Sequence, residues 1–155
     1  VSLGASGVQM ATRFVCTYEC DVADAYKEAY LSATKEDIVI IQSPVGMPGR
    51  VISNEFVKRI VRGERIDFGC EYKCLSTCDS KKVNYCIANA LFNAASGQMD
   101  KGFAMCGSNA YRVKKIISVK ELFAELVEGA RTSLKNKHFT QDQRRQISPE
   151  RKGNK

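Results

Sequence analysis

The segment from Val8 to Phe14 limits what this chain can fold into more than any other feature. It follows a Gly/Ser run that ends at Gly7, and its apolar residues are those typical of a buried strand leaving a tight turn. Ala11 and Thr12 lie near its far end, where exposed backbone N–H groups and a hydroxyl can bind an anion. In α/β barrels, the loops after the last strands commonly bind a phosphate in this way. The segment therefore predicts a strand with a phosphate site at its end, with simple packing of an apolar strand as the alternative.

Four motifs together resemble one protein family. They are residues 4–14 (GASGVQMATRF), 24–29 (DAYKEA), 107–113 (GSNAYRV) and 118–122 (SVKEL). They are similar to the flavin-dependent nitronate monooxygenases, formerly called 2-nitropropane dioxygenases, a family that includes the flavin-dependent enoyl-acyl carrier protein reductases. The resemblance covers about residues 3–130. One difference is Ala11, where the family usually has glycine.

The resemblance implies an α/β fold, namely the C-terminal part of a TIM (β/α)8 flavin barrel. Residues 1–15 would form the last barrel strand and its phosphate loop, and residues 16–105 a mostly helical cap inserted after that strand. Residues 106–130 would form a return loop and the closing barrel helix, followed by a basic disordered tail over residues 131–155. A complete barrel needs about 250 residues, and this chain has 155. We therefore expect it to represent the C-terminal half of a longer protein, with the first seven strands upstream.

The resemblance also implies an FMN-dependent oxidoreductase, with Gln9, Ala11 and Thr12 as cofactor-binding residues. The expected reaction is oxidation of alkyl nitronates by oxygen, and the alternative within the family is reduction of an enoyl thioester. The catalytic residues stay unknown, because the histidine base of the nitronate monooxygenases belongs to the N-terminal half and His138 lies in the predicted tail. Tyr111 and Arg112 match a loop near the flavin, where contact with the cofactor and simple packing are both open. We expect the 155 residues alone to be inactive.

The positive charge of the chain is concentrated at its end. The net charge is +7, but residues 1–130 hold 16 Lys or Arg and 15 Asp or Glu, whereas residues 131–155 hold 8 and 2. The charge therefore belongs to the predicted tail and not to a basic face of the folded part, which argues against a nucleic-acid partner. No run approaches the roughly 20 apolar residues of a membrane span. We expect a cytoplasmic protein with a small-molecule substrate and no nucleic-acid or membrane partner. A homodimer is an open alternative to a monomer.

Seven cysteines, an odd number, are typical of reduced thiols in a cytoplasmic protein. Four of them follow the spacing Cys70-x3-Cys74-x3-Cys78-x7-Cys86, and four thiolates can bind zinc or hold an iron–sulfur cluster. The pattern contains no Cys-x2-Cys pair, so we expect no metal that is essential to folding, while a metal or cluster stays an open alternative. A stand-alone cysteine-rich metal-binding module is accordingly the second class of function, and a non-catalytic remnant is the third.

The remaining segments predict an alternation of short elements. Helices are expected from Asp24 to about Ala33, after an N-cap at Ser53, from about Tyr85 to Ser96, and from Ser118 to about Arg131. The β-branched run at residues 38–41 and the segment at residues 50–52 flank a Pro/Gly turn and predict a hairpin. Residues 64–84 are polar and rich in cysteine. Ser118 and Glu121 have the spacing of a capping box at the start of the last helix.

Overall fold

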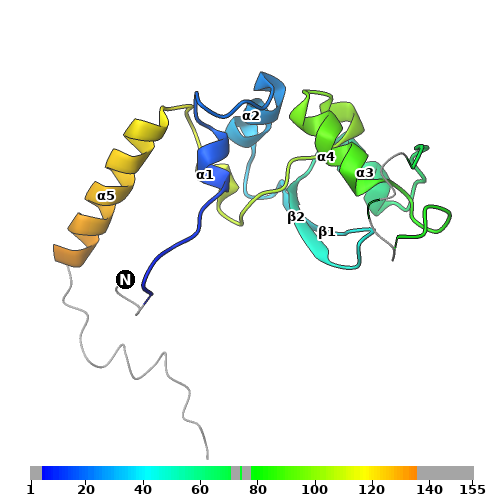
Figure 1. Ribbon diagram of the computed structural model, residues 1–155, viewed down its shortest axis with the longest axis horizontal. Coiled ribbons are helices and arrows are strands. Elements are labelled where there is room, and N and C mark those ends of the chain that lie inside the picture. Colours follow the sequence, from blue (N-terminus) through cyan, green and yellow to red (C-terminus); the bar gives the residue numbers. More distant parts are fainter. Residues whose placement is uncertain (1–4, 71–73, 75–77, 136–155) are drawn as a thin grey trace, which may run out of the picture. The chain divides into compact units, whose positions relative to one another are not determined.

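The computed structural model describes residues 5–70, 74 and 78–135. These residues divide into two units, one containing the described residues between 8 and 119 and the other residues 5–7 with residues 120–135. The larger unit contains the short helix α1 (Thr12–Val15), α2 (Asp24–Ser32), the hairpin strands β1 (Ile38–Gln42) and β2 (Pro48–Ile52), α3 (Glu55–Val61) and α4 (Ile87–Ala95). Two 3-10 turns, η1 (Met99–Lys101) and η2 (Ala110–Arg112), complete it (Figure 1). Helix α5 (Val119–Lys135) begins at Val119, the last residue of the larger unit.

The hairpin was predicted from the sequence and is confirmed. β1 and β2 pair antiparallel, with Ile38 opposite Ile52 and Val39 opposite Val51. Gly46 in the connecting turn has a φ of 86°, a left-handed conformation that favours glycine. The chain then returns to β2, because Val51 also forms an antiparallel bridge with Met105. Residues 104–106 therefore lie along the second edge of β2.

Two hydrophobic clusters lie on opposite faces of the hairpin, as the two-residue period of a strand requires. Val39, Ile41 and Val51 face the first cluster, in which the rings of Phe56, Tyr85 and Phe103 lie with centroids 6.0–6.1 Å apart. Ile38 and Ile52 face the second cluster, whose other buried members are Cys16, Tyr30, Ala33, Ala104, Ala110 and Val113. The hairpin thus supplies both clusters and fixes α2, α3 and α4 around it.

A polar contact also ties α3 to the region after α4. The Asn54 side-chain oxygen accepts a hydrogen bond from the Val57 amide at 2.8 Å and so caps α3. Its amide nitrogen donates to the carbonyls of Met99 and Gly102, each at 2.8 Å. Asn54 is therefore the N-cap, and the prediction of Ser53 was wrong: the Ser53 amide instead donates to the Asp37 carbonyl and continues the hairpin.

The strand predicted over Val8 to Phe14 is not present. Thr12–Val15 form a helical turn, and residues 5–11 belong to no strand. A strand needs a neighbour to satisfy its backbone groups, and no other described segment pairs with residues 8–11. Val8 is 78% exposed, in contrast to the burial that was predicted.

The other helices match their predictions with local corrections. In α2, Tyr30 is buried as predicted, but Lys27 is buried as well, whereas Ala25 is exposed. Val61, predicted to lie on the apolar face of α3, is 66% exposed at the end of that helix. The last helix begins where the Ser118–Glu121 spacing predicts, but it continues to Lys135 and so extends into the predicted tail. Residues 136–155 of that tail, with His138, lie outside the described residues.

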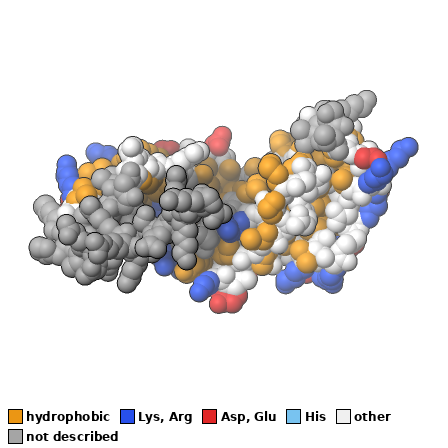
Figure 2. Space-filling model, turned by 90° about the horizontal axis from the view of Figure 1, so that it is seen from below, with side chains coloured by type: hydrophobic (Ala, Val, Ile, Leu, Met, Phe, Trp, Pro, Cys, Tyr) orange, Lys and Arg blue, Asp and Glu red, His pale blue; other side chains and the backbone are white. Residues whose placement is uncertain are grey.

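Hydrophobic side chains also reach the surface of the larger unit. Ile40, Met47 and Met105 are 63%, 67% and 43% exposed on and beside the hairpin. Figure 2 shows hydrophobic side chains on the face that carries the hairpin. Within the described residues, no helix is both long and apolar enough to cross a membrane.

Candidate functional site

The structure brings two of the family-like segments into direct contact. The Thr12 hydroxyl oxygen, at the start of α1, accepts a hydrogen bond of 2.8 Å from the backbone amide of Gly107. A Cβ atom added at Gly107 would lie 3.3 Å from the same oxygen, a tight contact. Residues 12 and 107, separated by 95 positions, therefore form one site that glycine at position 107 allows to close.

The Gly107 side of the site is built as a compact turn on β2. The Cys106 amide donates to the Arg50 carbonyl at 2.9 Å, and the Tyr30 hydroxyl donates to the Met105 carbonyl at 2.6 Å. The Ala110 amide then donates to the Gly107 carbonyl, closing the turn that leads into η2. The backbone before and after Gly107 is thus fixed by β2, α2 and the turn itself.

The α1 side of the site is held by a buried lysine. Lys27 is 6% exposed, and its ammonium group donates to the Thr17 carbonyl at 2.8 Å. The Thr17 hydroxyl donates in turn to the Phe14 carbonyl at 2.8 Å, and Thr17 forms a parallel bridge with Ile117. These contacts fix the direction in which the chain leaves α1. No pattern in the sequence indicated these contacts, because lysine is rarely buried.

The remaining predicted cofactor residues lie next to Thr12 on the surface. Gln9 and Ala11 are exposed, and Thr12 is half-buried. Ala11 has a φ of −126°, which lies outside the left-handed region that favours glycine. Its carbonyl accepts a 2.8 Å hydrogen bond from the Phe14 amide and starts α1.

Tyr111 and Arg112 contact each other in η2. The Arg112 guanidinium carbon lies 5.7 Å from the centre of the Tyr111 ring, and its Nε donates to the Tyr111 hydroxyl at 3.3 Å. Their predicted contact with a flavin stays a prediction. Near the site, burial raises the pKa of the thiols of Cys16 and Cys106. Both thiols therefore stay protonated at neutral pH, in which form a thiol is a poor nucleophile.

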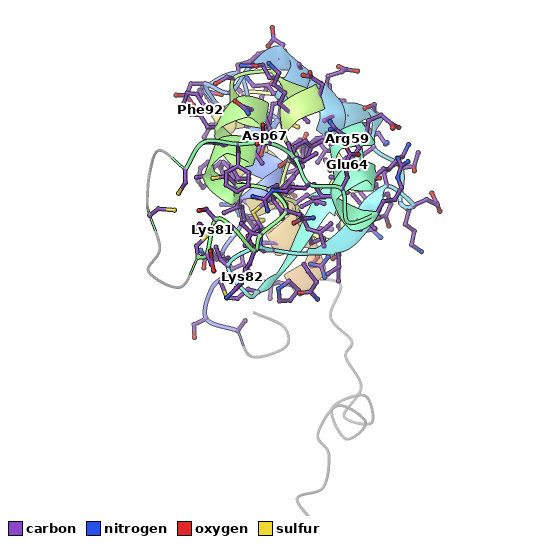
Figure 3. All side chains as sticks on the ribbon, turned by 90° about the vertical axis from the view of Figure 1, so that its right-hand side faces the viewer. Arg59, Glu64, Asp67, Lys81, Lys82 and Phe92 are labelled. Atoms are coloured by element: carbon purple, nitrogen blue, oxygen red, sulfur yellow. The ribbon has the colours of Figure 1, made fainter. Side chains whose placement is uncertain are left out.

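Two hollows lie elsewhere on the larger unit, and none of Gln9, Ala11 and Thr12 lines either of them. One, of about 160 Å³, lies between α3 and α4. Figure 3 shows Arg59 and Asp67, two of its lining residues, at this end of the unit. The other, of about 390 Å³, lies beside α2 and the end of β2.

The seven cysteines are free thiols. Cys70 and Cys74 are exposed, while Cys78 and Cys86 are half-buried. Among the residues that the structure describes, no three or more His, Cys, Asp or Glu side chains are arranged to hold a metal ion.

Comparison with known proteins places the chain in a family. The sequence profile of the family described as nitronate monooxygenase matches residues 1–129. The chain belongs to the nitronate monooxygenase family. The match includes both segments that meet at Thr12 and Gly107, and this family is flavin-dependent in general.

Curated relatives are oxidoreductases. A probable nitronate monooxygenase of Staphylococcus saprophyticus is 38% identical over 92 residues, which are 59% of this chain and 22% of that protein. The (3aS,4S,5R,7aS)-5-hydroxy-7a-methyl-1-oxo-octahydro-1H-indene-4-carboxyl-CoA dehydrogenase of Mycobacterium tuberculosis is 42% identical over 62 residues, which are 40% of this chain and 18% of that protein. The matches thus span about a fifth of the length of these relatives.

Solved structures of FabK from Thermotoga maritima have a similar fold. One superposes with a TM-score of 0.66 at 27% identity and covers 86% of this chain and 40% of FabK. A variant of the same protein gives a TM-score of 0.64 at 25% identity, covering 86% of this chain and 36% of that one. The described residues are thus a partial α/β arrangement related to a TIM-barrel family.

Proposed function

We propose that this chain forms part of an FMN-dependent oxidoreductase that oxidises nitronates, and that Gln9, Ala11 and Thr12 bind the phosphate of FMN. The contact between Thr12 and Gly107 carries this proposal, because it joins the predicted phosphate loop to a second segment of the family match. In the complete protein, residues 8–11, which precede α1, would pair with an upstream neighbouring strand and complete the barrel.

The donors at this site fit a phosphate. A threonine hydroxyl has one donor and two acceptor positions. Since Gly107 donates to the Thr12 oxygen, the hydroxyl proton can point outward to an oxygen of the ligand. The exposed Gln9 carboxamide adds donors, and the Ala11 side chain is a single methyl group that leaves the adjacent backbone accessible.

Within this scheme the chain binds and orients the cofactor. The flavin, when bound, supplies the redox chemistry. Thr12 and Gly107 would fix its phosphate relative to β2, and the Tyr111–Arg112 pair in η2 would border it. The described residues include no histidine, and we expect the base to come from the upstream part of the protein. The 155 residues alone are accordingly expected to be inactive.

The test compares Thr12→Val with Thr12→Ser in the full-length protein. Valine has a similar shape but removes both the acceptor for Gly107 and the donor for the phosphate, whereas serine keeps both. A hydrogen bond to a charged group contributes about 1.5–3 kcal/mol, so FMN affinity should fall about tenfold or more in Thr12→Val and little in Thr12→Ser. Unchanged affinity in Thr12→Val contradicts the assignment of the site. Oxygen uptake with an alkyl nitronate then tests the reaction.

A second candidate is reduction of an enoyl thioester. The fold similarity to FabK, an enoyl-acyl carrier protein reductase, over 86% of the chain favours it. The name of the carboxyl-CoA dehydrogenase also points to a thioester substrate for that relative. The same purified protein distinguishes the two reactions. Consumption of a nicotinamide cofactor with an enoyl thioester, without oxygen uptake on a nitronate, would support the reductase.

A further inference from the structure

Lys27 carries a buried positive charge for which the described residues provide no carboxylate partner. The residue is 6% exposed, and its ammonium group donates to the neutral Thr17 carbonyl at 2.8 Å. The ion pairs formed among the described residues do not include it. An ammonium that is buried without a counter-ion costs free energy, and a neutral donor could hold a carbonyl at lower cost. The charge of Lys27 therefore indicates a role beyond the bond to Thr17.

A short series of hydrogen bonds joins Lys27 to the proposed phosphate site. Its acceptor, Thr17, is 1% exposed and donates through its own hydroxyl to the Phe14 carbonyl at 2.8 Å. The Phe14 amide donates in turn to the carbonyl of Ala11, the residue before Thr12, at 2.8 Å. The series thus leads from α2 through α1 to the residues that are predicted to contact the phosphate, and Figure 1 shows the two helices as neighbours.

Helix α1 is too short to be ordered by itself. It is a single turn of four residues, no side chain caps its start, and none of its residues is buried. An isolated turn of this length is unstable, because nucleation fixes several backbone angles for one hydrogen bond. The position of Thr12 therefore depends on tertiary contacts. The bond from Gly107 fixes one side of the turn, and the bond from Lys27 to Thr17, which brings a full charge, fixes the other.

We propose that Lys27 is a positioning residue for the phosphate of FMN, a role that rests on the proposed function of Thr12. Through Thr17, its ammonium group fixes α1 so that the Thr12 hydroxyl meets the ligand. A phosphate bound at Thr12 supplies negative charge on the same short helix, and the protein interior screens the attraction between the two charges less than water does. Lys27 thus favours a flavin that carries a phosphate over one that lacks it.

The test compares FMN with riboflavin, which has the same ring system and ribityl chain but no phosphate. Full-length protein freed of flavin is titrated with each ligand, and the change in flavin fluorescence gives the two affinities. Lys27→Met keeps an unbranched apolar side chain of similar length and removes the ammonium group. Coupling between a binding site and a group outside it is typically about fivefold or more, so FMN affinity should fall about fivefold or more and riboflavin affinity less than about twofold.

Lys114→Met is the matched control. Lys114 also donates to a carbonyl, at 3.4 Å, but its acceptor is Ala33 at the C-terminal end of α2, so this variant should change neither affinity. A purely structural role of Lys27 would lower both affinities alike, because a distorted protein loses the whole flavin site. Equal losses for FMN and riboflavin in Lys27→Met, or no loss for either, overturn the proposal.

A second variant decides the case in which Lys27→Met does not fold. Thr17→Val keeps the shape of the buried side chain and the carbonyl that accepts from Lys27, but it removes the hydroxyl bond to Phe14. It should also lower FMN affinity severalfold and spare riboflavin, and without that selective loss the proposal fails.

Thr12→Val, titrated in the same way, separates this proposal from the proposed function. If Thr12→Val weakens FMN binding while Lys27→Met and Thr17→Val do not, only the role of Lys27 is wrong. If Thr12→Val leaves FMN affinity unchanged, the phosphate site itself is wrong, and the role of Lys27 is wrong with it.

Discussion

Gly102→Ala tests the packing of α4 against the segment that returns to β2. Gly102 is buried in an extended conformation with a φ of −167°, so the backbone itself tolerates an alanine. The added methyl carbon, however, would lie 1.9 Å from the Ala90 carbonyl oxygen and 3.1 Å from the Ala94 methyl carbon. The first distance lies far inside van der Waals contact and involves backbone, which no change of side-chain rotamer can relieve.

The two backbones must therefore separate by more than an ångström, or the helix must shift. Overpacking of a core typically costs about 1–3 kcal/mol and occasionally more, and this contact belongs at the upper end because a helix backbone has to move. The movement would also disturb the Asn54 hydrogen bond to the Gly102 carbonyl. We expect the free energy of unfolding to fall by about 3 kcal/mol or more, out of the roughly 5–15 kcal/mol of a typical domain.

Urea unfolding followed by circular dichroism measures this change. Gly129→Ala is the matched control, because nothing lies within 4 Å of a Cβ atom at that position in α5. There alanine should leave the stability unchanged or raise it by about 0.5–1 kcal/mol. A loss below about 1 kcal/mol in Gly102→Ala would refute the close approach of α4 and residue 102.

Two further predictions concern single polar groups. Asn54→Ala should lower the free energy of unfolding by about 2–4 kcal/mol, because it removes the cap of α3 and both hydrogen bonds to the segment after α4. Chemical denaturation measures this free energy. A loss as small as that of a substitution at an exposed position would contradict the role assigned to Asn54. Hydrogen bonds from the Thr34 amide and hydroxyl lower the pKa of the Asp37 carboxyl in the folded protein. The ionised carboxylate therefore stabilises the folded protein fully above the pKa of about 4 that Asp37 has in the unfolded chain. This stabilisation is lost as the pH falls through the lower pKa of the folded protein. The difference in stability between the unsubstituted protein and Asp37→Ala should shrink in that acidic range, and a pH-independent difference would refute it.

The sequence predicted elements whose pattern is local. The hairpin follows from β-branched residues around a Pro/Gly turn, and α3 and α4 follow from apolar residues at helical spacing, with left-handed glycines at positions 63 and 97. The N-cap was misplaced by one residue because Ser53 and Asn54 are both good caps, and a contact 45 residues away decides between them. Local patterns therefore placed the elements but not their exact ends.

Long-range contacts were the part that the sequence could not supply. The apolar residues within segment 8–14 do suit a strand, but a strand forms only where another segment pairs with it. Likewise, the meeting of Thr12 with Gly107 depends on residues 104–106 following β2, which no spacing in the sequence reveals. The resemblance to the family pointed to both segments, but their contact became visible only in the structure.

The anchoring of residues 104–107 has a thermodynamic consequence. The same short run of backbone bonds to β2 through Ile52 and Arg50, and to α1 through the Thr12 hydroxyl. A ligand that binds only when the Thr12 hydroxyl is in place must favour conformations in which this run is also docked on the hairpin. By linkage, occupancy at α1 would raise the stability of β2, and loosening of β2 would weaken binding at α1 by the same factor. If the proposed site at Thr12 binds the ligand, the hairpin, which touches no proposed ligand, is thus energetically coupled to it.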